Sequence, residues 1–385
     1  MKFIKNLKKL TGCSAGILTN QSAFGWNKNY HFISFSEDIK IDTLFLPEHG
    51  LFAELQDQVS GSELGYLFGD CNIVNLYGDK EDSLVPSRDV LQRLDIIVID
   101  IRDVGSRYYT FLTTAYYILE GISKLKKETG KAPLFIVVDS PNPIGDKVEG
   151  SPLAAEFESF VGVRSVLHRH GLSPAGLLNY YNETFELNVD IAVIPIGVYH
   201  PKSYQTLLWV PPSPNIPTQN TCYVYSGQCL LEGTNLSEGR GTTKPFEIFG
   251  APYLIGKAKE ELDKRLKAHQ TNAILMRPLR FLPTFHKFKD QICEGYQLLI
   301  KNPKKFHSLY FTLFFLKNLK ELFPNEFQYL RGVYEFRSDK PAIELLVGDR
   351  MLLRYLDGGI PDSELVSYLE NEEKNWFLAT KRFRY

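Results

Sequence analysis

Five short apolar runs in the first half of the chain, each followed by a polar or turn-forming segment, constrain the fold more than any other feature. They lie at residues 15–18, 41–46, 94–101, 134–138 and 191–196. Near-continuous apolar runs of this length are typical of strands buried on both faces of a parallel sheet. Helical patterns lie between them, at 87–94 and at 110–127, the second ending near Gly130. The alternation predicts a doubly wound α/β domain with a mainly parallel sheet.

The second half of the chain begins with a proline-rich segment, WVPPSPNIPTQN at 209–220. Proline restricts the backbone and has no amide hydrogen, so this segment is neither a helix nor a central strand. It is either the boundary between two domains or an ordered loop at a cleft. Beyond it, helical patterns at 253–269 and 306–323 alternate with strand-like runs at 273–276, 295–300 and 342–347. We therefore expect an α/β domain at 1–220 and a smaller α+β domain at 221–385.

Charge and motif content exclude several classes of function. The net charge is −1, which is not the basic footprint of a nucleic-acid-binding protein. No apolar run approaches the roughly 18 residues of a membrane span. The chain has no GxxxxGK[ST] pattern and no GxGxxG pattern, and its five cysteines lack the spacing of a metal site. We expect no nucleotide cofactor, no metal, no nucleic acid partner and no membrane partner, while the oligomeric state stays open.

The N-terminal segment indicates whether the protein is secreted. It is positively charged, but Lys5, Lys8 and Lys9 interrupt the apolar core that a secretory signal peptide requires. An odd number of cysteines is typical of reduced thiols in a reducing compartment. We therefore expect a cytoplasmic protein.

Polar side chains gather where the predicted strands end. In a parallel sheet, ligands bind beyond the carboxyl ends of the strands. Asp, Asn, Pro and Gly are also the usual loop formers after a strand, so a single such cluster is weak evidence. Four clusters together favour a site, and its candidate residues are Asn20, Gln21, Glu48, His49, Arg102, Asp103, Asp139 and Asn142.

A second dense segment, LEGTNLSEGRGTTKP at 231–245, combines glycines with charged and hydroxyl side chains. Its glycines allow the backbone to approach a ligand closely. A solvated loop explains the same composition, and the residues alone do not separate the two interpretations. Elsewhere, His170 is a candidate for a hydrogen bond to a sugar or to a carboxylate, and one of Tyr108 and Tyr109 is expected to face the cleft.

Eight motifs in this order resemble those of the NamZ family of exo-acting β-N-acetylmuramidases, formerly described as a domain of unknown function. The resemblance is dense from about residue 14 to 300. The motifs are TNQ at 19–21, PEHG at 47–50, DIRDVGSRYYTF at 100–111, DSPNPIGD at 139–146, VEG at 148–150, RHGLSPAGL at 169–177, WVPPSPNIPT at 209–218 and LEGTNLSEGRGTTKPFE at 231–247.

The resemblance implies a Rossmann-like N-terminal domain, a smaller C-terminal domain and an active site in the cleft between them. It implies release of N-acetylmuramic acid from the non-reducing end of peptidoglycan fragments, as in recycling of the cell wall. Two residues depart from the family pattern, because Arg102 stands where Gln is usual and Ser140 where Arg is usual. Either the cation has moved to a neighbouring strand end, or the preferred sugar differs.

Glycoside hydrolysis needs a carboxylic acid beside the glycosidic oxygen and usually a second carboxylate. Glu48 is our candidate for the acid, because apolar neighbours at a strand end favour a protonated carboxyl group. Candidates for its partner are Glu232, Asp103 and Asp139, and the acetamido group of the substrate is an alternative nucleophile. Arg240, followed by Arg107, is the candidate for binding the lactyl carboxylate. The substrate-binding candidates are Asn20, His49, Arg102, Arg107, Tyr109, Asp139, Asn142, His170, Asn235 and Arg240.

Two other classes of function stay open. One is a non-catalytic protein that binds muropeptides or sugars on the same fold. The other is a different cell-wall hydrolase, an amidase or a deacetylase, which normally needs a metal site or an activated Ser or Cys.

Overall fold

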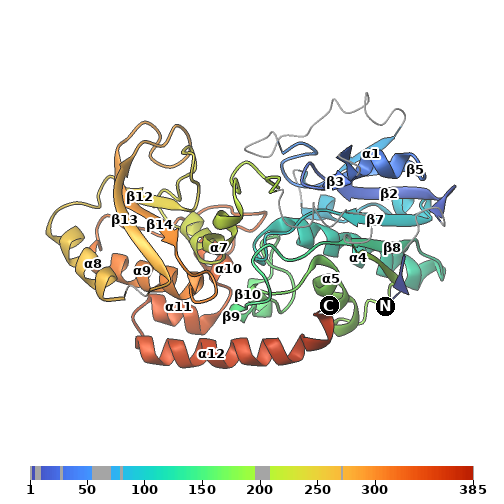
Figure 1. Cartoon of the computed structure of the whole chain (residues 1–385). Coiled ribbons are helices and arrows are strands. Elements are labelled where there is room, and N and C mark those ends of the chain that lie inside the picture. The colour runs from blue at the N-terminus through green and yellow to red at the C-terminus, as the bar shows by residue number, and fades with distance from the viewer. Residues whose placement is uncertain are drawn as a thin grey trace.

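A seven-stranded sheet in which all pairs are parallel forms the centre of the N-terminal half of the molecule (Figure 1). The structure is a computed structural model, and it describes residues 2–4, 10–26, 29–53, 71–78, 81–195, 209–269 and 272–384. The strand order is β1 (Lys2–Phe3), β11 (Ile191–Pro195), β8 (Leu134–Asp139), β7 (Ile96–Asp100), β2 (Ser14–Thr19), β5 (Lys40–Leu46) and β6 (Asn72–Asn75).

The five predicted runs are confirmed as strands of this one sheet, and β1 and β6 extend its two edges. The last residue of the fifth predicted run, residue 196, lies outside the described residues. The parallel register places Ile17 of β2 between Leu44 of β5 and Val98 of β7. Parallel pairing brings all carboxyl ends to one edge of the sheet, which is why the motifs that follow the strands lie near one another.

Helices cover both faces of the sheet. One face carries α3 (Arg88–Gln92), α4 (Thr110–Thr129) and α5 (Pro174–Thr184), and the other carries α1 (His31–Ser36). The ends of two predicted helices are marked by local signals. Ser87 accepts a hydrogen bond from the amide of Val90 and begins α3, and Gly130, with a φ of 72°, ends α4.

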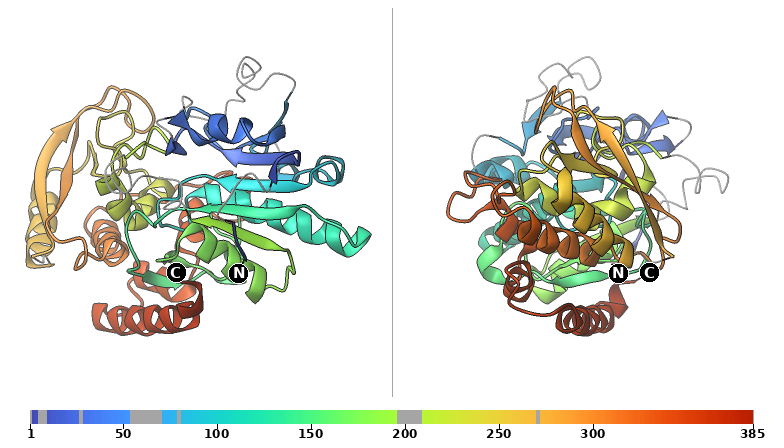
Figure 2. Two further views of the ribbon diagram at one scale, coloured as in Figure 1. Left: turned by 45° about the vertical axis from the view of Figure 1, so that its right-hand side comes forward. Right: turned by 90° about the vertical axis from the view of Figure 1, so that its left-hand side faces the viewer.

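The C-terminal half contains a three-stranded antiparallel sheet with helices beside it (Figure 2). The strand order is β12 (Ile248–Ala251), β14 (Cys293–Ile300) and β13 (Ile274–Phe281). The helical elements are α7 (Gln219–Gln228), the 3₁₀ helix η5 (Cys229–Gly233), α8 (Gly256–His269), α9 (Ser308–Leu322), α10 (Ala342–Val347), α11 (Arg350–Leu356), α12 (Asp362–Ala379) and the 3₁₀ helix η6 (Lys381–Phe383). The expected α+β mixture is therefore present.

Shorter elements lie between the strands and helices of the N-terminal half. They are the hairpin of β3 (Phe24–Trp26) and β4 (Asn29–Tyr30), the pair β9 (Glu149–Pro152) and β10 (Leu167–Arg169), and the 3₁₀ helices η2 (Glu81–Leu84) and η3 (Ala155–Phe157).

The prediction of a strand at 342–347 is wrong, because this segment is the helix α10. Five apolar residues around Glu344 fit a buried helix as well as a buried strand, and sequence periodicity does not separate the two. The flanking residues carry the decisive signal. Pro341 precedes the first turn, and Gly348 adopts a φ of 60° while its amide donates to the carbonyl of Glu344, which closes the helix.

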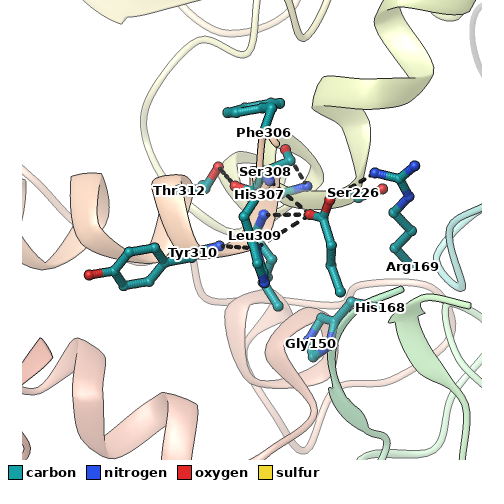
Figure 3. Close-up of polar contacts among 12 residues, drawn as sticks. Gly150, His168, Arg169, Ser226, Phe306, His307, Ser308, Leu309, Tyr310 and Thr312 are labelled. Carbon is teal, nitrogen blue, oxygen red and sulfur yellow. Dashed lines mark hydrogen bonds and ion pairs between the residues drawn. The ribbon is translucent and has the colours of Figure 1, made fainter. Parts of the chain in front are cut away.

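Buried charges of the N-terminal half bind both ends of the helical pair α9 and α10. The carboxylate of Glu149 accepts hydrogen bonds from the amides of Ser308 and Leu309 at the start of α9, at 2.8 and 3.4 Å. Figure 3 shows Ser308 and Leu309 at this junction, with Arg169 beside it. The guanidinium of Arg107 donates to the carbonyls of Leu346 and Val347 at the end of α10, at 2.8 and 2.9 Å.

Each charge matches the helix end that it meets, since the amino end of a helix is partly positive and the carboxyl end partly negative. The hydrophobic core on the α4 side of the sheet also continues without interruption into the C-terminal half. In addition, α12 packs against β9, and the indole of Trp376 donates to the carbonyl of His170 at 2.9 Å. The two halves are therefore held in one orientation.

Candidate active site

A pocket lies where the carboxyl edge of the large sheet meets the C-terminal half. It encloses about 480 Å³ of empty space, counted out to its open mouth. Three parts of the chain contribute to its wall. The lining residues are Glu48, His49, Tyr108, Tyr109, Thr110 and Val161, then Ser213, Asn215 and Ile216, and finally Tyr225, Cys229, Glu232, Arg240, Phe246, Tyr334 and Glu335.

Glu48 enters the pocket from the turn that follows β5. The amide of Gly50 donates to the carbonyl of Pro47 at 3.2 Å, and His49 adopts a left-handed φ of 69°, so the chain reverses directly after the strand. The Thr110 hydroxyl at the start of α4 donates to Oε2 of Glu48 at 2.8 Å. The imidazole Nε2 of His49 lies 3.9 Å from Oε1. The sheet and α4 together therefore orient this carboxyl group.

Glu232 and Arg240 form the opposite wall, on the segment 231–245 that the sequence singled out. Nη2 of Arg240 donates to Oε1 of Glu232 at 2.8 Å, and the Tyr334 hydroxyl donates to Oε2 at 2.9 Å. Nε of Arg240 also lies 3.3 Å from the buried carboxylate of Glu238. Burial alone would lower the pKa of Arg240, but these two carboxylates outweigh it and raise the pKa, so the guanidinium stays charged.

A third carboxyl group, Glu335, lines the pocket from the loop between α9 and α10. The Tyr77 hydroxyl donates to its Oε2 at 2.8 Å. Burial and the negative charge of Glu48 raise the pKa of Glu335 to about 8, although the hydrogen bond from Tyr77 acts in the opposite direction.

The proline-rich segment is an ordered loop at this pocket rather than a bare linker. The side-chain amides of Asn20 and Gln21 donate to the carbonyls of Pro212 and Pro211, both at 3.0 Å, and so attach the loop to the end of β2. Ser213 then lies beside the buried hydroxyl of Tyr109. Among the described residues, this hydroxyl makes no hydrogen bond of good geometry.

Five of the predicted site residues line the pocket: Glu48, His49, Tyr109, Glu232 and Arg240. The others belong to contacts that shape the surrounding loops. Asp103 accepts from the imidazole of His170 at 3.0 Å and from the amide of Gly105 at 2.8 Å. Asp139 accepts from the Ala175 amide at 2.9 Å and so binds the start of α5.

Three further candidates hold backbone segments in place. The guanidinium of Arg102 donates to the carbonyls of Ser22 and Phe24, at 2.8 and 3.4 Å. Asn142 bonds within its own loop and to the Leu172 carbonyl at 3.0 Å. Asn235 donates to the carbonyl of Glu326 at 2.7 Å and accepts from the Gln328 amide at 3.1 Å, which attaches the chain beyond α9.

Arg107 lies outside the pocket lining, because it is the buried residue that binds the end of α10. Burial lowers the pKa of its neighbour His168, and the charge of Arg107 lowers it further. A neutral imidazole fits the other contacts of His168, because Nδ1 accepts from the amide of Ser151 at 3.2 Å and Nε2 donates to the carbonyl of Val347 at 2.9 Å.

Sequence reasoning missed Glu335, Tyr334, Thr110 and Ser213 among the residues of the pocket. The first two lie in RGVYEFRSD at 331–339, where the sequence offers no recognisable motif. The only local signal is a glutamate between two aromatic residues. No cluster of three His, Cys, Asp or Glu residues with the geometry of a metal site occurs in the part of the chain that the structure describes.

Comparison with known proteins identifies the family. Residues 15–220 match the model of the N-terminal part of the exo-β-N-acetylmuramidase NamZ, and residues 223–385 match the model of its C-terminal part. The chain belongs to the NamZ family. Peptidoglycan β-N-acetylmuramidase NamZ of Bacillus subtilis (strain 168) is 34% identical to it over 382 residues, which are 98% of this chain and 87% of the relative.

Two crystal structures share the fold. Both are DUF1343 family proteins of Bacteroides fragilis NCTC 9343, with TM-scores of 0.79 and 0.68 at 21% and 23% identity. Each match covers 98% of this chain, and the matches cover 95% and 94% of the two solved chains. The expected architecture, a Rossmann-like parallel sheet followed by an α+β unit, is therefore that of known members of this fold.

Proposed function

We propose that this NamZ family member is an exo-acting glycoside hydrolase that releases N-acetylmuramic acid from the non-reducing end of peptidoglycan fragments. The observation that carries the proposal is the match of both NamZ models across 15–220 and 223–385. The relative from Bacillus subtilis acts on peptidoglycan as a β-N-acetylmuramidase. A pocket with three carboxyl groups and one guanidinium supplies the chemistry that such hydrolysis needs.

Glu48 is the residue for which we propose the role of proton donor to the leaving oxygen. It follows a buried strand and accepts a hydrogen bond from Thr110, so its position is fixed before substrate binds. Preorganised placement of an acid beside the scissile bond is what general acid catalysis requires. Asp103, one of the predicted partners, is engaged by His170 and Gly105 instead of lining the pocket.

Arg240 is the group for which we propose contact with the lactyl carboxylate of the substrate. It is the guanidinium among the residues that line the pocket. A guanidinium binds a carboxylate through charge-assisted hydrogen bonds. Glu232, which pairs with Arg240 in the structure, would then share this cation with the substrate.

Release of free N-acetylmuramic acid from a defined N-acetylmuramyl disaccharide tests the proposal. The purified protein is incubated with the disaccharide, and the products are separated and identified. Binding of the disaccharide without cleavage would support the non-catalytic alternative. Release of acetate, or of peptide from a muropeptide, would support a deacetylase or an amidase.

A cytoplasmic location, in which the enzyme acts on imported wall fragments, forms part of the proposal. All five cysteines are free thiols, which suits a reducing compartment. Among the described residues, the structure has no helix that is long and apolar enough to cross a membrane.

A further inference from the structure

The turn that carries Glu335 has an unusual backbone. Tyr334 and Arg337 exchange both of their backbone hydrogen bonds, at 2.8 and 2.9 Å, so the two residues between them form the tip of a tight turn. Glu335 and Phe336 have φ values of 46° and 68°. Two successive positive φ angles are the hallmark of a type I′ turn, which asparagine and glycine normally occupy. A glutamate and a phenylalanine in these places keep a strained backbone, as is common at functional sites.

Contacts with the N-terminal half hold this tip rigidly. The ring of Phe336 packs on Tyr77 and Phe160, with centroid distances of 5.5 and 6.0 Å. The guanidinium of Arg337 binds the carboxylate of Asp339 at 2.7 Å and also donates to the carbonyl of Glu158. The carboxyl group of Glu335 therefore reaches the pocket from the C-terminal half while its backbone is fixed against the N-terminal half.

The second carboxyl group at the pocket, Glu232, is already engaged at both oxygens. Arg240 binds one oxygen and the Tyr334 hydroxyl binds the other. Glu335 differs, because within the described part of the chain it accepts one side-chain hydrogen bond, from the hydroxyl of Tyr77.

We propose that Glu335 is the second catalytic carboxyl group and acts with Glu48 as one acid–base pair on the glycosidic bond. The inference rests on the proposed glycosidase function and assigns the partner that the sequence sought in Glu232 or Asp103. The charges that face Glu335 are those of Glu48 and Glu232, which raise its pKa, and of Arg240, which lowers it. Because the two carboxyl groups disfavour each other's negative charge, we expect the pair, rather than either group alone, to hold one proton at neutral pH.

The chemistry balances over one turnover. In the reactive form Glu48 carries the proton that the pair shares, and Glu335 is ionised. Glu48 gives this proton to the glycosidic oxygen as the bond from that oxygen to C1 of the muramyl residue breaks. The oxygen of a water molecule bonds to C1, and Glu335 takes the proton which that water loses. The pair then again holds one proton, and water is the only co-reactant.

Glu335→Gln tests the pair, with kcat and kcat/KM measured on the muramyl disaccharide from about pH 5 to 9. We expect kcat to fall by roughly 10²–10⁴-fold with little change in KM, as for loss of an acid–base group. We also expect the alkaline limb of the pH profile to move to lower pH, because the remaining carboxyl group no longer shares its proton with a neighbouring charge. Loss of structure alone would not move this limb.

Glu344→Gln is the matched control, since Glu344 lies on the nearby helix α10 outside this pocket. It should leave kcat and the pH profile unchanged. If wild-type protein releases no N-acetylmuramic acid, the proposed function itself fails. If wild-type protein is active while a folded Glu335→Gln protein keeps its kcat within about threefold and the same alkaline limb, only the pairing with Glu48 is overturned.

If Glu335→Gln does not fold, the variant Tyr77→Phe provides the test. Tyr77→Phe keeps the ring that packs on Phe336 and removes the hydrogen bond that lowers the pKa of Glu335. The alkaline limb should then move to higher pH. An unchanged limb in an active Tyr77→Phe protein would overturn the proposal.

Discussion

Replacing Glu149 with glutamine tests how the two halves of the molecule are held together. The carboxylate of Glu149 is fully buried and lies at the amino end of α9. Its oxygens meet Nη1 of Arg169 at 2.8 Å, Nζ of Lys147 at 3.0 Å and Nδ1 of His307 at 3.4 Å. Glutamine keeps the shape of the side chain and removes its charge, so the three basic groups lose their common partner.

The pKa of Glu149 gives the size of the expected loss of stability. Burial alone would raise the pKa of Glu149, but the charges of His307, Arg169 and Lys147 outweigh it and lower the pKa from 4.5 to about 2. A difference of about 2.5 pH units at about 1.36 kcal/mol each corresponds to about 3 kcal/mol of stability at neutral pH. Breaking a buried ion pair on one side typically destabilises by about 3–5 kcal/mol, which agrees.

Urea unfolding at neutral pH measures the difference in the free energy of unfolding, and we expect about 3–5 kcal/mol between wild type and Glu149→Gln. The native pKa is depressed, so the stabilisation is complete above pH 4.5 and is lost as the pH falls towards 2. The gap between the two proteins should therefore narrow over that interval.

Glu156→Gln is the matched control, because the ion pair of Glu156 with Arg350 also joins the two halves but lies at the surface. Solvent screens exposed pairs, so this variant should unfold almost as wild type does. A Glu149→Gln protein whose stability and acid sensitivity equal those of wild type would refute the reasoning about the junction.

Three more substitutions have defined outcomes. Glu48→Gln should lower turnover of the muramyl disaccharide by roughly 10²–10⁴-fold and affect substrates with very good leaving groups less; near-wild-type turnover by the folded variant would move the acid elsewhere. Arg240→Ala should weaken kcat/KM for muramyl substrates by roughly 1.5–3 kcal/mol relative to glucosaminyl analogues, and equal losses on both would argue against contact with the lactyl group. Gly150→Ala should lower the thermal midpoint, since Gly150 has a φ of 103° and a Cβ there would lie 2.3 Å from Nδ1 of His168; Gly130→Ala, with no atom within 4 Å of its Cβ, is the milder comparison and should lower it less.

The five central strands of the large sheet and the helices α3, α4, α8 and α9 could be predicted because their signals are local. A buried parallel strand is a short apolar run, and a helix shows its caps, as Ser87 and Gly130 do. The segment 342–347 could not be assigned in this way, because five apolar residues around one glutamate suit either a helix or a strand until packing selects one. The helices α5, α7, α11 and α12 were not predicted for a related reason, since their apolar faces become evident only against their partners.

Within the site, the sequence by itself determined the family motifs and, through them, Glu48, Glu232 and Arg240, because each belongs to a contiguous run of distinctive residues. Only the tertiary structure decided that Asp103, Asp139, Asn235 and Arg107 bind neighbouring segments, and that Glu335 lies at the pocket with Glu48. The physical reason is that hydrogen-bond partners, burial and the electrostatic influence of one carboxyl group on another depend on distances between segments that are far apart in the chain. Such distances exist only after the sheet, α9 and α10 have packed.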